Sequence, residues 1–264
     1  MRADGARWAD LSTRVATGAG LVAVGVAGVW AGGHAFHALV ALVCGLMVWE
    51  LVGMLRPGWP GRIALGAVAG SAALASVYLP PGLALPLLLM PAILGFGLVA
   101  RGRAIYIVST TIVLLAGFGL MALRDDFGAL WMLWLVAVVV ASDVLGYFGG
   151  RLIGGPKFWP RVSPKKTWSG TVAGWIGGGG VGAALAGATG AGPGLIGVSV
   201  AVAMAAQMGD IAESAIKRHL GVKDSSALLP GHGGLLDRFD GMLGAAVFVL
   251  VAEQVVRFPA GGVP

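Results

Sequence analysis

The chain has 264 residues, of which 57% are hydrophobic and 11% are charged, and its mean hydropathy is +0.87. Apolar runs of about twenty residues recur along nearly all of it, which is typical of a polytopic membrane protein and excludes a soluble globular domain. The net charge of +6 does not indicate a nucleic-acid partner, because the basic residues lie in short loops between apolar runs. Cys44 is the only cysteine, so an intramolecular disulfide is excluded.

The hydropathy pattern predicts an all-α integral membrane protein with about nine transmembrane helices. Arg2, Arg7 and Arg14 precede the first span as they would in a signal peptide, but several spans follow, which favours an uncleaved first helix. The predicted spans are residues 15–31, 35–55, 63–79, 83–100, 104–123, 128–150, 169–189, 193–216 and 241–257.

The basic residues predict the orientation of the chain. Sixteen of the 18 Lys and Arg residues precede the first span or lie in the loops after the second, fourth, sixth and eighth spans. Only Arg124 and Arg257 fall on the other side. Positively charged loops stay in the cytoplasm. The amino terminus is therefore predicted on the cytoplasmic side of the cell (inner) membrane, and the carboxyl terminus on the opposite side. Residues 1–264 then form one polytopic domain.

Within that domain, residues 1–140 are predicted to be mainly apolar spans, and residues 141–257 a catalytic half. The catalytic half contains the two largest loops, 151–168 and 217–240, and both are predicted to face the cytoplasm.

Small residues recur at every fourth position of the seventh predicted span, at Gly174, Gly178, Gly182, Ala186 and Gly190. This spacing lays them along one helix face and predicts close packing of another helix. The same stretch contains a G-x-G-x-x-G pattern that begins at Gly177. A dinucleotide site would need a preceding strand and a soluble βαβ unit, so we interpret the glycines as a packing face.

A cluster of ionisable residues extends from Asp210, in the inner part of the eighth predicted span, to Asp240, just before the ninth. Charged groups at membrane depth cost free energy, so such a cluster indicates a functional site. Asp210, Ser214 and Lys217 are at positions i, i+4 and i+7 and share one helix face. They are predicted to line a cavity that opens to the cytoplasm. A salt bridge between Glu213 and Lys217 is the alternative, but it leaves the deeper Asp210 unexplained.

The loop that follows is rich in glycine and leads to two carboxylates, Asp237 and Asp240. Glycines let the backbone approach a ligand closely, and carboxylates are the hard ligands that Mg²⁺ prefers. Four cations suited to phosphate lie in the same region, at Lys217, Arg218, Lys223 and Arg238. The pattern indicates metal-assisted phosphoryl transfer. In the alternative, the loop is solvated and its acids are helix N-caps.

Residues 214–240 resemble the signature of the phosphatidate cytidylyltransferase (CDP-diacylglycerol synthase) family. The matching positions are Ser214, Lys217-Arg218, Lys223-Asp224, His232-Gly233-Gly234 and Asp237-Arg238-Phe239-Asp240. So many fixed positions within 27 residues make the match specific.

The resemblance extends to residues 143–151 and 163–170. The positions there that depart from the family pattern are Val144 and Ser169. Glu50, next to Trp49 at the inner end of the second span, is similar to a further family feature, although it could instead pair with Arg56.

The resemblance implies that CTP and phosphatidic acid react to give CDP-diacylglycerol and pyrophosphate, with Mg²⁺ and, optionally, a second monovalent or divalent cation. Catalytic roles are expected for Ser214, Lys217, Arg218 and Asp240. Substrate contacts are expected for Asp143, Lys165, Lys166, Lys223, His232, Gly233, Gly234 and Arg238. Asp210 and Asp237 are the expected metal ligands. The expected partners are CTP, phosphatidic acid and membrane lipid, without nucleic acid, and the resemblance suggests a homodimer.

Three other classes of function compete with this interpretation. A transporter could also bury Asp143 and Asp210, but it would more often show inverted repeats, and none is found. A CTP-dependent lipid kinase would transfer the γ-phosphoryl group instead. A purely structural membrane protein is the third. A CDP-alcohol phosphotransferase is disfavoured, because no Asp-Gly-x-x-Ala-Arg stretch occurs.

Overall fold

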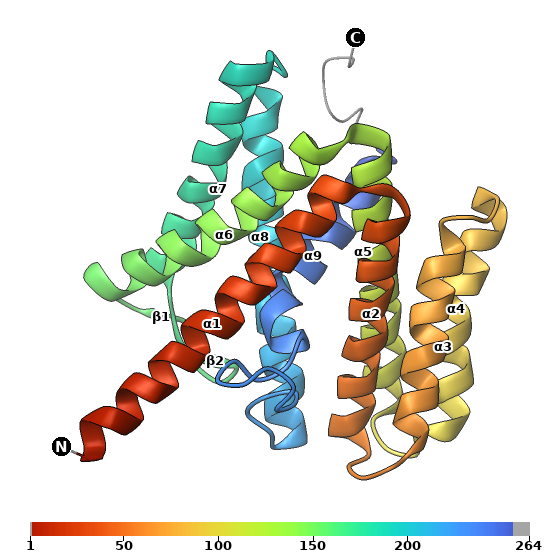
Figure 1. Cartoon of the computed structure of the whole chain (residues 1–264). Helices are drawn as coiled ribbons and strands as arrows, with labels where there is room; N and C mark the ends of the chain where they lie inside the picture. The colour runs from red at the N-terminus through yellow and green to blue at the C-terminus, as the bar shows by residue number, and fades with distance from the viewer. Residues whose placement is uncertain (1, 256–264) are drawn as a thin grey trace. The chain divides into compact units, whose positions relative to one another are not determined.

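The computed structural model describes residues 2–255, and that range contains nine α-helices and one short β-hairpin (Figure 1). The elements are α1 (Arg2–Ala31), α2 (Gly33–Leu55), α3 (Gly61–Ser76), α4 (Pro81–Leu98), α5 (Arg103–Phe127), α6 (Ala129–Leu152), β1 (Lys157–Trp159), β2 (Ser163–Thr167), α7 (Trp168–Thr189), α8 (Gly194–Leu220) and α9 (Leu236–Ala252). The predicted all-α fold is confirmed for these residues. Arg257, at the end of the ninth predicted span, and the side chains of Arg2 and Arg7 lie outside the described part.

The helix bounds follow the apolar runs, with two exceptions. α1 begins at Arg2 rather than at residue 15, so the helix extends through the polar amino-terminal segment. α9 begins at Leu236 rather than at residue 241, so the helix includes both carboxylates of the signature. In both places helical hydrogen bonding continues through charged residues that a hydropathy pattern assigns to loops.

Five of the helices in the described part of the chain are long and apolar enough to cross a membrane. They are α1 from Ser12, α2, α5, α6 and α8. α3 and α4 are apolar but shorter. An apolar helix of about twenty residues matches the hydrocarbon core of a bilayer. The chain therefore has the architecture of a helical membrane protein.

The fold divides into two compact units. The first contains Met1–Met121 and Leu220–Phe239, and the second contains Ala122–His219 and Asp240–Pro264. The loop between α8 and α9 thus belongs to the first unit, with α1 to α4.

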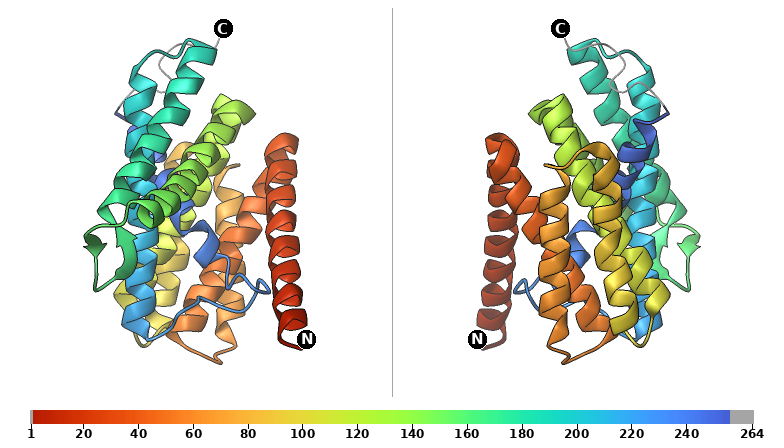
Figure 2. Two further views of the ribbon diagram at one scale, coloured as in Figure 1. Left: turned by 90° about the vertical axis from the view of Figure 1, so that its left-hand side faces the viewer. Right: turned by 90° about the vertical axis from the view of Figure 1, so that its right-hand side faces the viewer.

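In the first unit, α2 packs closely against α3, and α4 follows beside α3. Glycines allow this approach: a β-carbon added at Gly45 would lie 2.8 Å from the Gly66 carbonyl oxygen. α1 makes few contacts with α2 but meets the α8–α9 loop. Figure 2 shows that loop reaching the amino-terminal half of α1.

In the second unit, the predicted glycine face of α7 is confirmed as a packing surface. A β-carbon at Gly174 would lie 2.4 Å from Gln207 Nε2, and one at Gly178 would lie 2.7 Å from the Ala203 β-carbon. Both partners belong to α8, so the face packs within the chain. Gly190 does not continue this face. It ends the helix in the left-handed conformation, with φ 73°, a role that glycine fills at little cost.

Candidate active site

Asp210 of α8 is the centre of a polar cluster in the second unit. Its Oδ2 pairs with Lys166 Nζ at 2.5 Å, and its Oδ1 accepts a hydrogen bond from Ser214 Oγ at 3.3 Å. Ser214 lies one helical turn beyond Asp210, so the predicted shared face of α8 is confirmed for these two residues. Lys166 comes from β2, and its ammonium also donates to the Gln207 carbonyl at 3.4 Å. One carboxylate thus connects the hairpin to α8.

Two further carboxylates act electrostatically on this cluster. Asp143 of α6 interacts with the charges of Asp210 and Lys166. Asp240 of α9 interacts with Asp210, Asp143 and Lys217. Like charges repel, so three carboxylates that interact across three helices favour the binding of cations.

Lys217 forms a salt bridge with Glu213, as the alternative interpretation predicted. Its Nζ pairs with Glu213 at 2.5 Å, four residues earlier on α8, and both side chains are mostly buried. The same ammonium also interacts with the charge of Asp240. The salt bridge therefore does not remove Lys217 from the polar cluster.

The segment predicted as the 151–168 loop contains the β1–β2 hairpin, which presents Lys166 to α8. The strands pair antiparallel, with Lys157 opposite Thr167 and Trp159 opposite Ser163. Thr167 then caps α7, since its side chain accepts a hydrogen bond from the Gly170 amide at 3.2 Å. The cap fixes where the hairpin ends and the helix begins.

The loop between α8 and α9, residues 221–235, carries much of the family signature and is the signature loop of the first unit. Asp237 stabilises its conformation. Its Oδ2 accepts hydrogen bonds from the Ser225 amide at 2.8 Å, the Ser225 hydroxyl at 2.9 Å and the Gly234 amide at 2.8 Å. A carboxylate in the first turn of a helix is also favoured by the helix dipole. The N-cap alternative for Asp237 is therefore wrong, because Asp237 lies within the first turn of α9 and its Oδ2 accepts hydrogen bonds from groups that precede the helix.

Glu50 of α2 is buried beneath the same loop, at 1% exposure. Its carboxylate accepts hydrogen bonds from the Ser226 hydroxyl at 2.6 Å, the Leu235 amide at 2.9 Å and the Leu236 amide at 2.8 Å. The alternative pairing of Glu50 with Arg56 is wrong, because the Arg56 guanidinium donates to the Leu98 carbonyl instead. Glu50 holds both ends of the signature loop and satisfies the first amides of α9.

These two carboxylates explain the glycine pair that follows His232. A β-carbon at Gly233 would lie 2.8 Å from Asp237 Oδ2, and the backbone there has φ 80°. A β-carbon at Gly234 would lie 2.5 Å from Glu50 Oε1. The glycines are required by the carboxylates that hold the loop.

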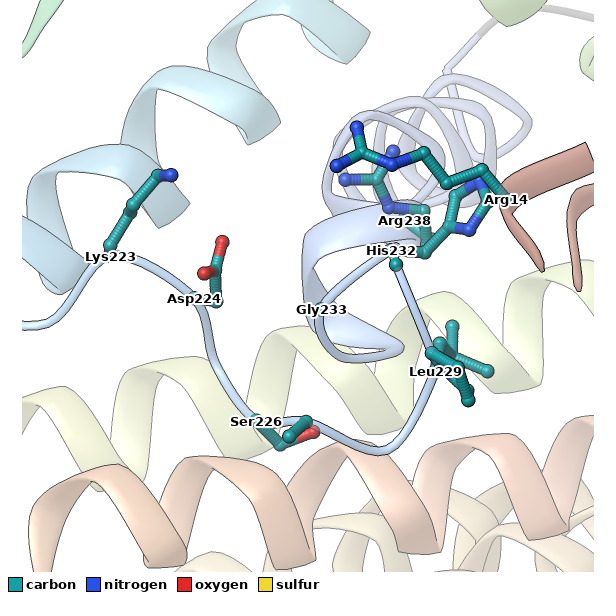
Figure 3. A pocket seen from close by; sticks show the side chains of 11 residues that line it. Arg14, Lys223, Asp224, Ser226, Leu229, His232, Gly233 and Arg238 are labelled. Carbon is teal, nitrogen blue, oxygen red and sulfur yellow. The ribbon is translucent and has the colours of Figure 1, made fainter. Parts of the chain in front are cut away.

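A cavity of about 450 Å³ is lined by residues of the signature loop together with Arg14 and Arg238. Its charged lining residues are Arg14, Lys223, Asp224 and Arg238. Figure 3 shows these side chains with His232, Ser226 and Leu229 around the opening. The cavity size is within the range of small-molecule sites, about 300–1,000 Å³. Three cations and one carboxylate give the lining a positive charge, which favours phosphate.

The predicted site residues thus form two groups. The group in the second unit contains Asp143, Lys166, Asp210, Ser214, Lys217 and Asp240. The group in the first unit contains Lys223, His232, Gly233, Gly234, Asp237 and Arg238. Lys165 and Arg218 are exposed, and their roles stay predictions.

Two further residues of the first unit, Glu50 and Arg14, contribute to the signature loop and its cavity and were not predicted as site residues. Glu50 was noted only as a family feature, and Arg14 was counted only as a charge that sets orientation. No local pattern joins either residue to a loop more than 170 positions away.

The donor set of the second unit fits a divalent cation. Within residues 12–255, no three His, Cys, Asp or Glu side chains gather closely enough to enclose a metal by themselves. Mg²⁺, however, is usually held by one or two carboxylates together with phosphate oxygens and water. Asp210, on which Asp143 and Asp240 act electrostatically, could supply one such carboxylate.

Comparison with known proteins identifies the family of this chain. Residues 12–256 match the family model described as the cytidylyltransferase family. The chain belongs to this family. The match extends beyond the signature, through the helices that carry Glu50 and Asp143 and the strand that carries Lys166.

Curated relatives are proteins named phosphatidate cytidylyltransferase. The chain is 42% identical over 152 residues to the protein of Brucella abortus biovar 1 (strain 9-941), covering 54% of this chain and 56% of the relative. It is 41% identical over 140 residues to that of Helicobacter pylori (strain ATCC 700392 / 26695), covering 49% of each. For Mycobacterium bovis (strain ATCC BAA-935 / AF2122/97), 41% identity over 140 residues covers 51% of this chain and 44% of the relative. The chain thus aligns with about half the length of these curated relatives.

Proposed function

We propose that this family member is a phosphatidate cytidylyltransferase, which transfers the cytidylyl group of CTP to phosphatidic acid. The observation that carries the proposal is the signature loop. Glu50 and Asp237 hold it from beneath, and it carries a positively charged cavity. The names of the curated relatives support the same substrates.

The proposed reaction needs little acid–base chemistry. A phosphate monoester has a second pKa of about 6, so the lipid phosphate is already mostly dianionic at neutral pH. One of its oxygens forms a bond to the α-phosphorus of CTP while the bond to the β-phosphate oxygen breaks, and pyrophosphate leaves. The protein must relieve charge repulsion and align the reactants. Lys223 and Arg238 line a cavity suited to phosphate oxygens. Lys217 stays a proposed catalytic cation on the basis of the family signature.

We propose Mg²⁺ as the cofactor, held by Asp210 with Asp143 and Asp240 as supporting carboxylates. Mg²⁺ bound there would offset negative charge on the CTP phosphates. Lys166 and Ser214 keep the Asp210 carboxylate in place through the ion pair and hydrogen bond described above. Asp237 as a second ligand stays a prediction, beside its observed role in the loop.

Product analysis tests this proposal against its rivals. Purified protein in detergent, given CTP, phosphatidic acid and Mg²⁺, should yield a lipid whose mass has increased by one cytidylyl group. A lipid that gains only a phosphoryl group, with release of CDP, would indicate a lipid kinase. CTP that stays intact while the lipid moves across a vesicle membrane would indicate a transporter.

We further propose nine spans, with the catalytic loops on the cytoplasmic side of the inner membrane. The 16-to-2 distribution of basic residues supports this orientation. Pro160 lies before the amino-terminal end of α7, and Ala188 lies near its carboxyl-terminal end. Both residues are exposed, which makes them suitable labelling positions. Cys44 is buried and should contribute little background.

In intact cells, an impermeant thiol reagent should label Ala188→Cys and leave Pro160→Cys unlabelled. Both variants should label once the membrane is made permeable, which controls for reactivity. The reverse pattern in intact cells would show that the hairpin faces outward, away from cytosolic CTP.

A further inference from the structure

Arg14 of α1 belongs to the cavity of the signature loop, although it lies more than 200 positions before that loop. Figure 3 shows the guanidinium groups of Arg14 and Arg238 on one side of the cavity, close to the His232 ring. Lys223 and Asp224 lie on the other side. The lining thus combines three cations with one carboxylate, and this excess of positive charge favours an anion.

α1 is closely fitted to the loop at this position. A β-carbon added at Gly231 would lie 2.7 Å from Arg14 Cγ, and Gly231 has φ 75°, so glycine is required for two reasons. One helical turn after Arg14, a β-carbon at Gly18 would lie 3.5 Å from His232 Nε2. Arg14 and Gly18 share one helix face because they are four residues apart. That face packs on the turn formed by Gly231 and His232.

His232 gives an independent indication of a ligand. Its Nδ1 is buried and has no hydrogen-bond partner among the described residues. A buried polar atom without a partner costs free energy, and such atoms in a native fold commonly point to a missing ligand or water. His232 lines the same cavity as Arg14 and Arg238.

Phosphate is the anion that matches this lining best. A guanidinium group forms two parallel hydrogen bonds to phosphate oxygens, which a single ammonium does not. Both proposed substrates carry phosphate, and the rest of α1 distinguishes between them. Beyond Arg14 this helix is apolar and exposed, with Val15 at 62%, Val22 at 66% and Trp30 at 79% exposure. Acyl chains can lie along that surface, whereas a nucleotide gains nothing from it.

We infer that Arg14 binds the phosphate group of the lipid substrate. The inference rests on the proposed function for the identity of the lipid, and it extends the site to a residue of the first helix. Arg14 carries the charge, and Gly18 and Gly231 permit the close packing that places it in the cavity.

Steady-state kinetics of Arg14→Gln tests this inference. The KM for phosphatidic acid should rise at least about tenfold, the change expected when one charge-assisted contact is lost. The KM for CTP should stay within twofold of its original value, roughly the scatter of such measurements. Arg14→Lys should recover part of the loss, since it keeps the charge without the planar group.

Arg101→Gln is the matched control, because Arg101 is an exposed arginine of the same unit outside the cavity. If Arg14→Gln changed neither KM more than this control does, Arg14 would not bind substrate. A rise in the KM for CTP alone would overturn the assignment to lipid.

A binding measurement separates this inference from the proposed reaction. Without CTP, the protein should bind mixed micelles that contain phosphatidic acid more tightly than micelles of phosphatidylcholine, and Arg14→Gln should remove that preference. If the protein formed no CDP-diacylglycerol but kept an Arg14-dependent preference, the proposed reaction would fail and the inference would hold. If the reaction proceeded and Arg14→Gln bound both micelles as the unmodified protein does, only the inference would fail.

Discussion

Replacing Asp210 by Asn should reduce the formation of CDP-diacylglycerol by about 10²–10³-fold, the scale of losing one group that stabilises transition-state charge. The substitution nearly preserves shape but removes the charge that pairs with Lys166 and that we propose holds Mg²⁺. The Mg²⁺ concentration needed for half-maximal CTP binding should rise in parallel. Normal turnover with unchanged Mg²⁺ dependence would show that Asp210 only forms a structural ion pair and does not bind Mg²⁺.

Asp125→Asn is the matched control for Asp210→Asn. Asp125 is an exposed carboxylate near the end of α5, in the same unit, and it has no place in the proposed site. Lys166→Met separates the two roles of Asp210. If only the ion pair mattered, Lys166→Met would cause the same loss with no change in Mg²⁺ dependence, and the double variant would add nothing.

Glu50→Gln should cause the second largest loss, although Glu50 is not proposed to touch either substrate. An amide in place of the carboxylate turns one hydrogen-bond acceptor, which faces either the Leu235 amide or the Leu236 amide, into a donor. A buried donor left without a partner costs about 1–3 kcal/mol, so the loop should lose its fixed conformation. We expect turnover to fall by about tenfold to a hundredfold.

Limited proteolysis distinguishes this positioning role from a general loss of stability. Cleavage after Lys223, in the loop that Glu50 holds, should accelerate in Glu50→Gln while the rest of the chain stays resistant. Glu253→Gln makes the same chemical change after α9 and should leave the loop protected. Unchanged cleavage after Lys223 together with full activity would show that Glu50 does not position the loop.

Local and periodic features could be predicted from the sequence. The apolar runs and their Pro and Gly breaks predicted where the nine helices of residues 2–255 lie, because length and hydropathy largely determine such segments. The shared face of Asp210 and Ser214 and the Glu213–Lys217 pair follow from helical spacing alone. The glycine face of α7 was predicted in the same way.

Contacts between distant segments could not be predicted in this way. Glu50 meets Leu235 across 185 positions, and nothing near Glu50 in the sequence indicates that partner. Arg14 was interpreted only as one of the charges that set membrane orientation, because arginines near an amino terminus usually have that role. The hairpin was missed because β2, with the sequence Ser-Pro-Lys-Lys-Thr, lacks the apolar alternation that predicts a strand.

The central claim is that a lipid phosphate attacks the α-phosphorus of CTP, and the fate of two labels tests it most directly. Purified protein, Mg²⁺ and phosphatidic acid would be incubated in parallel with CTP labelled at the α-phosphate or at the γ-phosphate. We predict that the α label appears in the lipid and the γ label in free pyrophosphate. A γ label in the lipid, or no label in the lipid from either CTP, would contradict the account.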